Sequence, residues 1–336
     1  MIKLKIQLFG GRGHRSGLGV GGPGIGIATG IDIGKGAGKN MILEAYSEYP
    51  NFPDPDYSDY KVKTNNEFIK DTFNLIDYKR ANHDDVAKAY LKSLKLKSNV
   101  EYSSRNDDLS FGYVYSYVDN ITGKTQVLRY NLNPADTRRM EYKVKTMIHE
   151  GYHACDDGLI HEGIDMSMAK YKFHEETRTE MSALYLANKL NGYTYVPSYA
   201  LEVVSAAAKY VRMAEYKNCK TLYDLGKRFY NDRMVNRKNP SFKLLEKNFR
   251  QIHLDDNYYK KYYNRIANNK NNYYEICKNS LFNHEYFNDK YEKIYKDSFD
   301  SMVNKISSNN GFSFSKIEEQ LFVQCVALSM NDGGIL

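Results

Sequence analysis

Two histidines and a glutamate stand at a spacing that suits metal chemistry. The chain reads His149-Glu150-Gly-Tyr-His153, a His-Glu-x-x-His pattern. In a helix, residues four apart lie one turn apart on the same face, so both imidazoles can bind one tetrahedral zinc ion. Glu150 projects about a hundred degrees around such a helix, where it can take a proton from a water molecule activated by the metal. The pattern predicts a zinc site with Glu150 as the general base.

The residues around this pattern predict the helix that it needs. Apolar and small side chains recur at steps of three and four. They are Met140, Val144, Met147, Ile148, Gly151, Ala154 and Cys155. Asp136 or Thr137 can cap the start of this helix, and its end is expected near Asp157. The alternative is two surface histidines on an amphipathic helix, and the helical context of the motif favours the metal site.

A catalytic zinc ion takes three protein ligands and keeps one position open. The candidates for the third ligand that follow in the chain are Asp157, His161, His174, Glu175, Glu176 and Glu180. A second helix is expected over Tyr171–Asn191, and one of its faces carries Glu176, Glu180, Ala183 and Ala187. Because the two alanines allow close approach to the metal helix, Glu180 is the predicted ligand. Asp157 and Glu176 remain alternatives, and Asp157 could instead orient a histidine.

The order of these residues also carries a family resemblance. The pattern His149-Glu150-x-x-His153, followed by Glu180-Met-Ser-Ala183, resembles the HExxH metallopeptidases of the ImmA/IrrE type. In that group the third ligand lies on a later Glu-x-x-Ala helix. Over about residues 100–190, the resemblance implies a zinc peptidase with His149, His153 and Glu180 as ligands. Leu184 stands where the group carries Asp or Asn.

A hairpin is predicted just before the metal helix. Aromatic and β-branched residues alternate from Phe111 to Asn131 around a turn that contains Gly123, which is typical of two paired strands. The hairpin could supply an edge strand for an extended peptide, or it could only pack on the helices. The predicted fold class is therefore α+β and zincin-like, with this small sheet packed on the HExxH helix and the second, Glu-bearing helix. That domain is expected over 61–198, followed by a mostly helical region over 199–336.

The chain begins with a glycine-rich segment. Thirteen of the 23 glycines lie between Gly10 and Gly38, so residues 1–46 are predicted to be a flexible tail, joined by a proline-rich linker over 47–60. The GxGxxG match at Gly17–Gly22 lacks the strand-turn-helix context of a nucleotide site. A P-loop is excluded because Ile33 and Asn40 occupy two of its defining positions.

A second resemblance lies at the start of the chain. The run Ile6-Gln7-Leu8-Phe9-Gly10-Gly11-Arg12-Gly13 resembles the LQFFGGRG leader of bacteriophage minor head and related structural proteins. This resemblance implies a phage or prophage origin and association with virion proteins.

Composition excludes several classes of partner and compartment. The net charge is +7, but Lys and Arg form no long run, so a nucleic-acid partner is not expected. The Tyr/Lys/Asn-rich stretch over 255–272 could stack bases, although packing is the favoured role of its tyrosines. Four separated cysteines indicate a reducing compartment. No segment suits a membrane span or a secretory signal, so the protein is expected in the host bacterial cytoplasm or in the virion.

These patterns together predict zinc-dependent hydrolysis of a peptide or protein substrate. Two alternatives from other classes remain. One is a phage structural protein in which a zincin-like fold serves assembly and the metal is structural or lost. The other is a basic nucleic-acid-associated protein with an incidental His-Glu-x-x-His.

Overall fold

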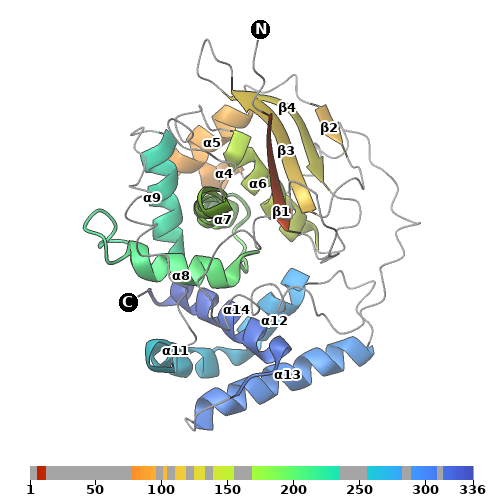
Figure 1. The fold of residues 1–336 in the computed structure, drawn as a ribbon, viewed down its shortest axis with the longest axis vertical. Helices are drawn as coiled ribbons and strands as arrows, with labels where there is room; N and C mark the ends of the chain where they lie inside the picture. The colour runs from red at the N-terminus through yellow and green to blue at the C-terminus, as the bar shows by residue number, and fades with distance from the viewer. Residues whose placement is uncertain are drawn as a thin grey trace.

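Helices dominate the computed structural model of this chain (Figure 1). The structure describes residues 6–12, 78–95, 101–103, 110–118, 125–132, 139–154, 169–234, 256–281, 289–308 and 313–335. Most of this described part is helical. The predicted tail and linker, apart from a strand over Ile6–Arg12, lie outside the described residues.

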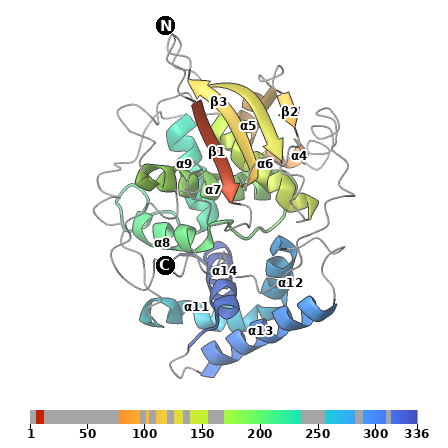
Figure 2. The ribbon, with the colours of Figure 1, turned by 45° about the vertical axis from the view of Figure 1, so that its right-hand side comes forward.

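The helices form two groups along the chain. The first group is α4 (Tyr78–Ala81), α5 (Asp85–Lys95), α6 (Met140–Ala154), α7 (Ala169–Asn191), α8 (Ala200–Tyr210) and α9 (Leu222–Met234). The second group is α11 (Asp256–Asn268), α12 (Lys270–Leu281), α13 (Asp289–Ser308) and α14 (Lys316–Asp332). Helices α11–α14 lie at the end of the molecule away from the strands (Figure 2).

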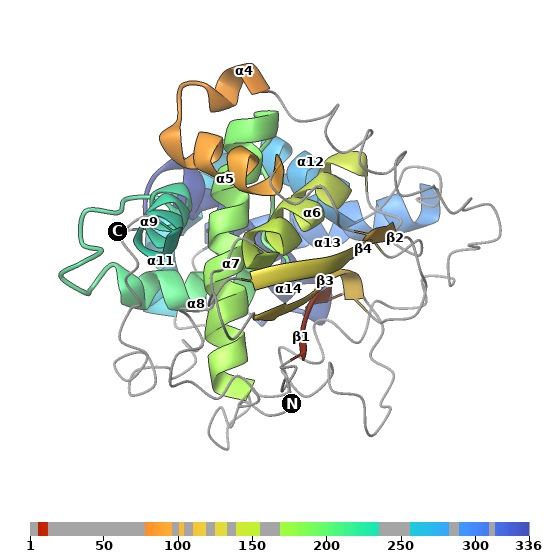
Figure 3. The same cartoon turned by 90° about the horizontal axis from the view of Figure 1, so that it is seen from above.

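The centre of the first group is the pair α6 and α7. Every residue from 142 to 153 and from 175 to 187 is buried. A helix that is buried around its whole circumference must be covered on all sides by other elements. Helix α7 packs against α6 on one side and α9 on the other, as Figure 3 shows. Contact with α9 is close at Gly226, where an added Cβ would lie 2.1 Å from the carbonyl oxygen of Met181.

The apolar side chains form two cores that share helices. One core draws on α4–α7 and the other on α8, α9 and α11–α14. Helix α7 gives Leu184 to the first core and Met181 to the second, while α9 gives Tyr230 to the first and Phe229 to the second. The predicted domain boundary near residue 198 lies between α7 and α8. Because α7 and α9 contribute to both cores, the two cores are joined across this boundary.

Four short strands form a sheet beside α6. They are β1 (Ile6–Arg12), β2 (Glu101–Ser103), β3 (Ser110–Val118) and β4 (Thr125–Leu132), in the order β1-β3-β4-β2. The predicted hairpin is confirmed, since β3 and β4 pair antiparallel. Of the two roles left open for the hairpin, an edge for an extended peptide is restricted in this sheet, because β1 pairs along β3 and β2 pairs with Arg129–Asn131 of β4.

The prediction of an α+β, zincin-like fold is wrong. The described residues are mostly helical. The strand side chains that the structure describes as buried and apolar, Val114, Tyr130 and Leu132, belong to neither hydrophobic core. The small sheet covers the outside of α6 and does not form the layer around which the helices pack. Alternating aromatic residues overstated the sheet in the sequence, because they signal local strand pairing but not how much of the core rests on it.

Helices α11 and α12 were not predicted, because their sequence shows weak apolar periodicity. Tyrosines supply the buried face instead. Tyr259 and Tyr263 place their rings 5.3 Å and 6.1 Å from the ring of Phe322 on α14, measured between centroids. These side chains are buried in the helical core, which supports the packing role and leaves them unavailable for stacking on bases.

The N-terminus of α5 is held by Asp84, as expected for a capping residue. Its Oδ1 accepts hydrogen bonds from the backbone N–H groups of Val86 and Ala87, each at 3.0 Å. Its Oδ2 accepts from the hydroxyl of Tyr185 on α7, and Lys227 Nζ on α9 lies 3.8 Å away. Burial opposes ionisation of Asp84, but these partners outweigh it and lower the pKa below its ordinary value of 3.8.

Replacing Asp84 with Ala should therefore destabilise the fold by about 1–3 kcal/mol, through loss of the helix cap and of the partner of Tyr185. Asp84 stabilises the fold above the pKa of the unfolded state, and this contribution is lost as the pH falls through the lower folded pKa. Urea unfolding of wild type and variant at pH 7 and pH 3 measures both effects. Asp85→Ala is the control, because Asp85 is fully exposed beside Lys88. Equal unfolding midpoints for wild type and Asp84→Ala would show that the cap contributes nothing.

Candidate metal centre

Helix α6 brings the two histidines of the motif together, as their spacing predicts. The imidazole rings of His149 and His153 lie 4.9 Å apart between centroids. Both residues are buried, with 2% and 1% of their surfaces exposed, and Glu150 between them has none exposed. The predicted surface alternative is therefore excluded, because these histidines face the packed interior.

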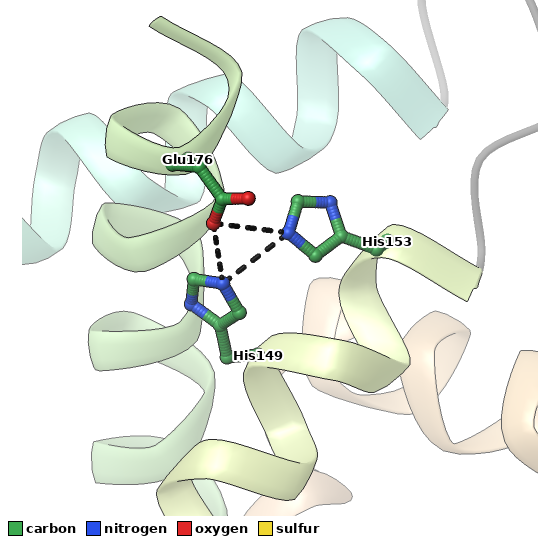
Figure 4. Close-up of side chains that lie close together, drawn as sticks. All are labelled: His149, His153 and Glu176. Atoms are coloured by element: carbon green, nitrogen blue, oxygen red, sulfur yellow. Dashed lines mark hydrogen bonds and ion pairs between the residues drawn. The ribbon is translucent and has the colours of Figure 1, made fainter. Parts of the chain in front are cut away.

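Helix α7 supplies the third member of the cluster, Glu176. Its Oε2 lies 3.1 Å from Nε2 of His149 and 3.5 Å from Nε2 of His153, and the two nitrogens are 3.2 Å apart (Figure 4). Ligand atoms about 2.0–2.1 Å from a tetrahedral ion are separated from each other by about 3.3–3.4 Å. The triangle of donor atoms therefore has the size that a bound metal ion of this kind requires.

The other nitrogen of each imidazole has a partner of its own. Nδ1 of His149 donates to Oε2 of Glu180 at 2.8 Å. Nδ1 of His153 lies 3.4 Å from Oγ1 of Thr179 and 3.6 Å from Oε1 of Glu175. A proton held on Nδ1 leaves the lone pair of Nε2 directed into the cluster. Both imidazoles are thus oriented with Nε2 toward the cluster.

Three ligand atoms converge on one buried point. The two Nε2 atoms lie beside the Glu176 carboxylate, whose second oxygen, Oε1, is buried and has no hydrogen-bond partner among the described residues. Without a metal ion, a proton on Nε2 of His149 bridges to Glu176, and a cation bound by all three atoms takes the place of that proton. The chemistry of the donor set therefore fits a metal ion.

The charges around the cluster favour a cation as well. Four carboxylates lie beside the two histidines, and each is at most 2% exposed: Glu150, Glu175, Glu176 and Glu180. One of them, Glu180, is paired with a buried lysine, Lys145. Buried negative charge is costly unless positive charge balances it, and a divalent ion at the cluster supplies that balance.

The network also keeps its carboxylates ionised. Burial alone raises the pKa of Glu176, but its interactions with His153 and His149 outweigh burial and lower the pKa to about 2. The pKa of Glu180 is likewise held far below its ordinary value, against burial, by Lys145 and His149. Burial lowers the pKa of His149, yet its bonds to Glu176 and Glu180 raise it to about 10. At neutral pH both glutamates are therefore charged and His149 is protonated, so a metal ion must displace the proton of His149 when it binds.

The predicted residues thus take different places in the site. His149 and His153 come together, and Glu150 lies close enough to act on the charge of His149. Glu180, the predicted third ligand, lies at Nδ1 of His149, and Glu176 joins the two Nε2 atoms. The alternatives Asp157 and His161 lie outside the described residues, and the side chain of His174 is not described.

The sequence placed Glu176 on the correct face of α7 but did not show that it, and not Glu180, joins the two histidines. Glu176 and Glu180 are four residues apart, so they share one face of α7. A shift of α7 by one helical turn would bring one of them to the position that the other now holds against α6. The buried Lys145, one turn before His149, is the residue that distinguishes them, because it pairs with Glu180.

Comparison with known protein families, curated proteins and solved structures found no match. The resemblances to the ImmA/IrrE-type peptidases and to the phage leader therefore stay predictions. Among the described residues, no helix is both long and apolar enough to cross a membrane.

The two glutamates can be separated by their effects on metal affinity. We expect Glu176→Gln to weaken zinc binding by more than about 100-fold and Glu180→Gln by about 10–100-fold, because the first removes a ligand and the second only the partner of one. Competition against a chromogenic chelator measures both affinities. Glu318→Gln, which changes a buried, hydrogen-bonded glutamate on α14, is the control and should leave the affinity unchanged. If Glu180→Gln abolished binding while Glu176→Gln kept it, Glu180 would be the ligand.

Proposed function

We propose that the protein is a metal-dependent hydrolase that cleaves peptide bonds, with zinc as its metal ion. The observation that carries the proposal is the convergence of His149, His153 and Glu176 on one point with Glu150 beside it. Two imidazoles and one carboxylate form a donor set that is typical of catalytic zinc sites. The substrate class, a peptide or protein, comes from the resemblance of the motif.

Each polar residue of the cluster has a role in this proposal. His149, His153 and Glu176 would hold the ion, which when bound supplies Lewis acidity toward water and a carbonyl group. Glu180 accepts the hydrogen bond from Nδ1 of His149. Thr179 and Glu175 lie near Nδ1 of His153, so each ring is held at the nitrogen that does not face the metal site. These contacts fix the direction in which both nitrogens point before the ion binds.

Glu150 is the residue that we assign to proton transfer. It follows His149 directly on α6, its side chain is fully buried, and its charge raises the pKa of His149. A carboxylate in this place can accept a proton from the attacking water and deliver it to the leaving amine. Water-excluded surroundings strengthen such electrostatic effects.

The same donor set also suits iron. Two histidines and one carboxylate bind Fe(II) in enzymes that use oxygen. Glu150 favours hydrolysis, because a general base beside the ion is required for activation of water. Elemental analysis of protein purified without chelator decides between the two metals.

The second candidate function is a structural metal that fastens α6 to α7. Its support is the burial of the cluster, in which no ligand is more than 2% exposed. Structural zinc sites, however, are usually closed by four protein ligands, and the described residues bring three together. An open position suits catalysis better, so hydrolysis is the preferred function.

Replacing Glu150 with Gln should separate metal binding from chemistry. Glutamine has nearly the same shape but cannot accept the proton, so we expect unchanged zinc content and hydrolysis reduced by about 10²–10⁴-fold. The assay is cleavage of denatured casein, with and without chelator, and Glu141→Gln on the same helix is the matched control. Full activity in Glu150→Gln would refute the assigned mechanism.

Metal removal distinguishes the two candidate functions. If the ion is only structural, the wild-type protein should show no chelator-sensitive hydrolysis under any substrate condition. It should still lose stability on chelation, by about 2.7 kcal/mol from a state with zinc at 100 times its dissociation constant. Thermal unfolding with and without zinc measures this loss, and an unchanged melting temperature would show that no ion binds.

A further inference from the structure

We infer that Lys145 is a positioning residue of the metal centre, which fixes Glu180 behind His149 and so presents Glu176 to the metal ion. This inference deepens the proposed function and rests on its metal site. It concerns a lysine that contacts Glu180 and Ser198 and is not one of the three metal ligands. Its effect passes through Glu180.

The contacts of Lys145 place it at one end of the cluster. Its amine donates to Oε1 of Glu180 and to Oγ of Ser198, the latter at 2.9 Å. The backbone N–H of Ser198 donates to the same Oε1 at 2.7 Å. These donors hold one carboxylate oxygen of Glu180, and the other oxygen is thereby directed at Nδ1 of His149.

The spacing along both helices means that these contacts fix the register of α6 against α7. Lys145, His149 and His153 lie at successive turns on one face of α6, and Glu180 and Glu176 lie at successive turns on the facing side of α7. The contacts run in the order Lys145, Glu180, His149, Glu176, His153. Because Lys145 pairs with Glu180, Glu176, which is one turn earlier on α7, lies between the two histidines.

A slide of α7 by one turn would break this order. In one direction it would place Glu176 beside Lys145 and carry Glu180 past Lys145, which leaves no carboxylate between the histidines. In the other direction Glu180 would lie between the histidines and Lys145 would lose its carboxylate, so in either case buried charges would lose their partners. Buried polar pairs are well attested as devices that select one register of paired helices. Lys145 is 1% exposed, so water cannot substitute for the carboxylate that it binds.

The test is a double-mutant cycle on zinc affinity in the full-length protein. We expect Lys145→Met to weaken zinc binding by about 10–100-fold, the size of effect seen when an outer partner of a ligand is lost. In a Glu180→Gln background, the same Lys145→Met change should alter zinc affinity by less than about 3-fold, because the Glu180 carboxylate through which Lys145 acts on His149 is no longer present. A purely structural lysine would give equal effects in both backgrounds.

Two further variants keep the test sharp. Ser198→Ala retains the charge of Lys145 but removes one of its partners, so it should weaken zinc binding in the same direction and by a smaller factor. It also covers the case in which Lys145→Met does not fold. Lys143→Met is the matched control, since Lys143 is also buried on α6 but lies about 200° around the helix from Lys145. Its zinc affinity should equal that of wild type.

A spectroscopic readout reports the ligand set itself. In protein loaded with Co²⁺, Lys145→Met should change the visible d–d absorption, because the carboxylate and imidazole donors are no longer held in place. An unchanged spectrum together with additive or absent effects on affinity would overturn the inference while leaving the metal site intact. A wild-type chain that binds no divalent ion would overturn both the inference and the proposed function. Metal binding with the expected coupling but no hydrolysis would refute the hydrolase alone.

Discussion

The structure depends on a ladder of buried polar side chains between two antiparallel helices. Lys145, His149 and His153 on α6 alternate with Glu180 and Glu176 on α7, and every neighbouring pair in the ladder is within hydrogen-bonding or ion-pairing distance. Each of these groups is costly to bury alone. The arrangement is stable only when all of them meet, which makes the relative position of α6 and α7 the central constraint of the fold.

The rest of the described chain holds these two helices in place and keeps water away from them. The hydroxyl of Tyr90 on α5 donates to the carbonyl of Ile148 at 3.0 Å, and the hydroxyl of Tyr142 on α6 donates to the carbonyl of Ile276 on α12 at 3.2 Å. Both of the cores of the protein reach α7, one through Leu184 and the other through Met181. Exclusion of water strengthens the electrostatic contacts of the ladder and the affinity expected of a metal ion within it.

Local features of this chain were predictable from sequence because local physics determines them. The metal helix and the hairpin that becomes β3 and β4 follow from periodicity and strand alternation. What the sequence left open was the relation between elements. Glu176 and Glu180 share one face, so helical periodicity cannot say which meets the histidines, and only the partner of Lys145 decides it. The helical cores built from tyrosine, as in α11 and α12, were hidden because tyrosine also occurs in loops and strands.

X-ray absorption at the metal edge, on protein purified without chelator, tests the central claim most directly. Zinc held by His149, His153 and Glu176 should show only nitrogen and oxygen neighbours at about 2.0–2.1 Å, with the multiple-scattering pattern of two imidazoles. In Glu176→Gln the imidazole signal should weaken or the metal should be lost. A sulfur shell at about 2.3 Å, or protein that carries no metal in any preparation, would contradict the account.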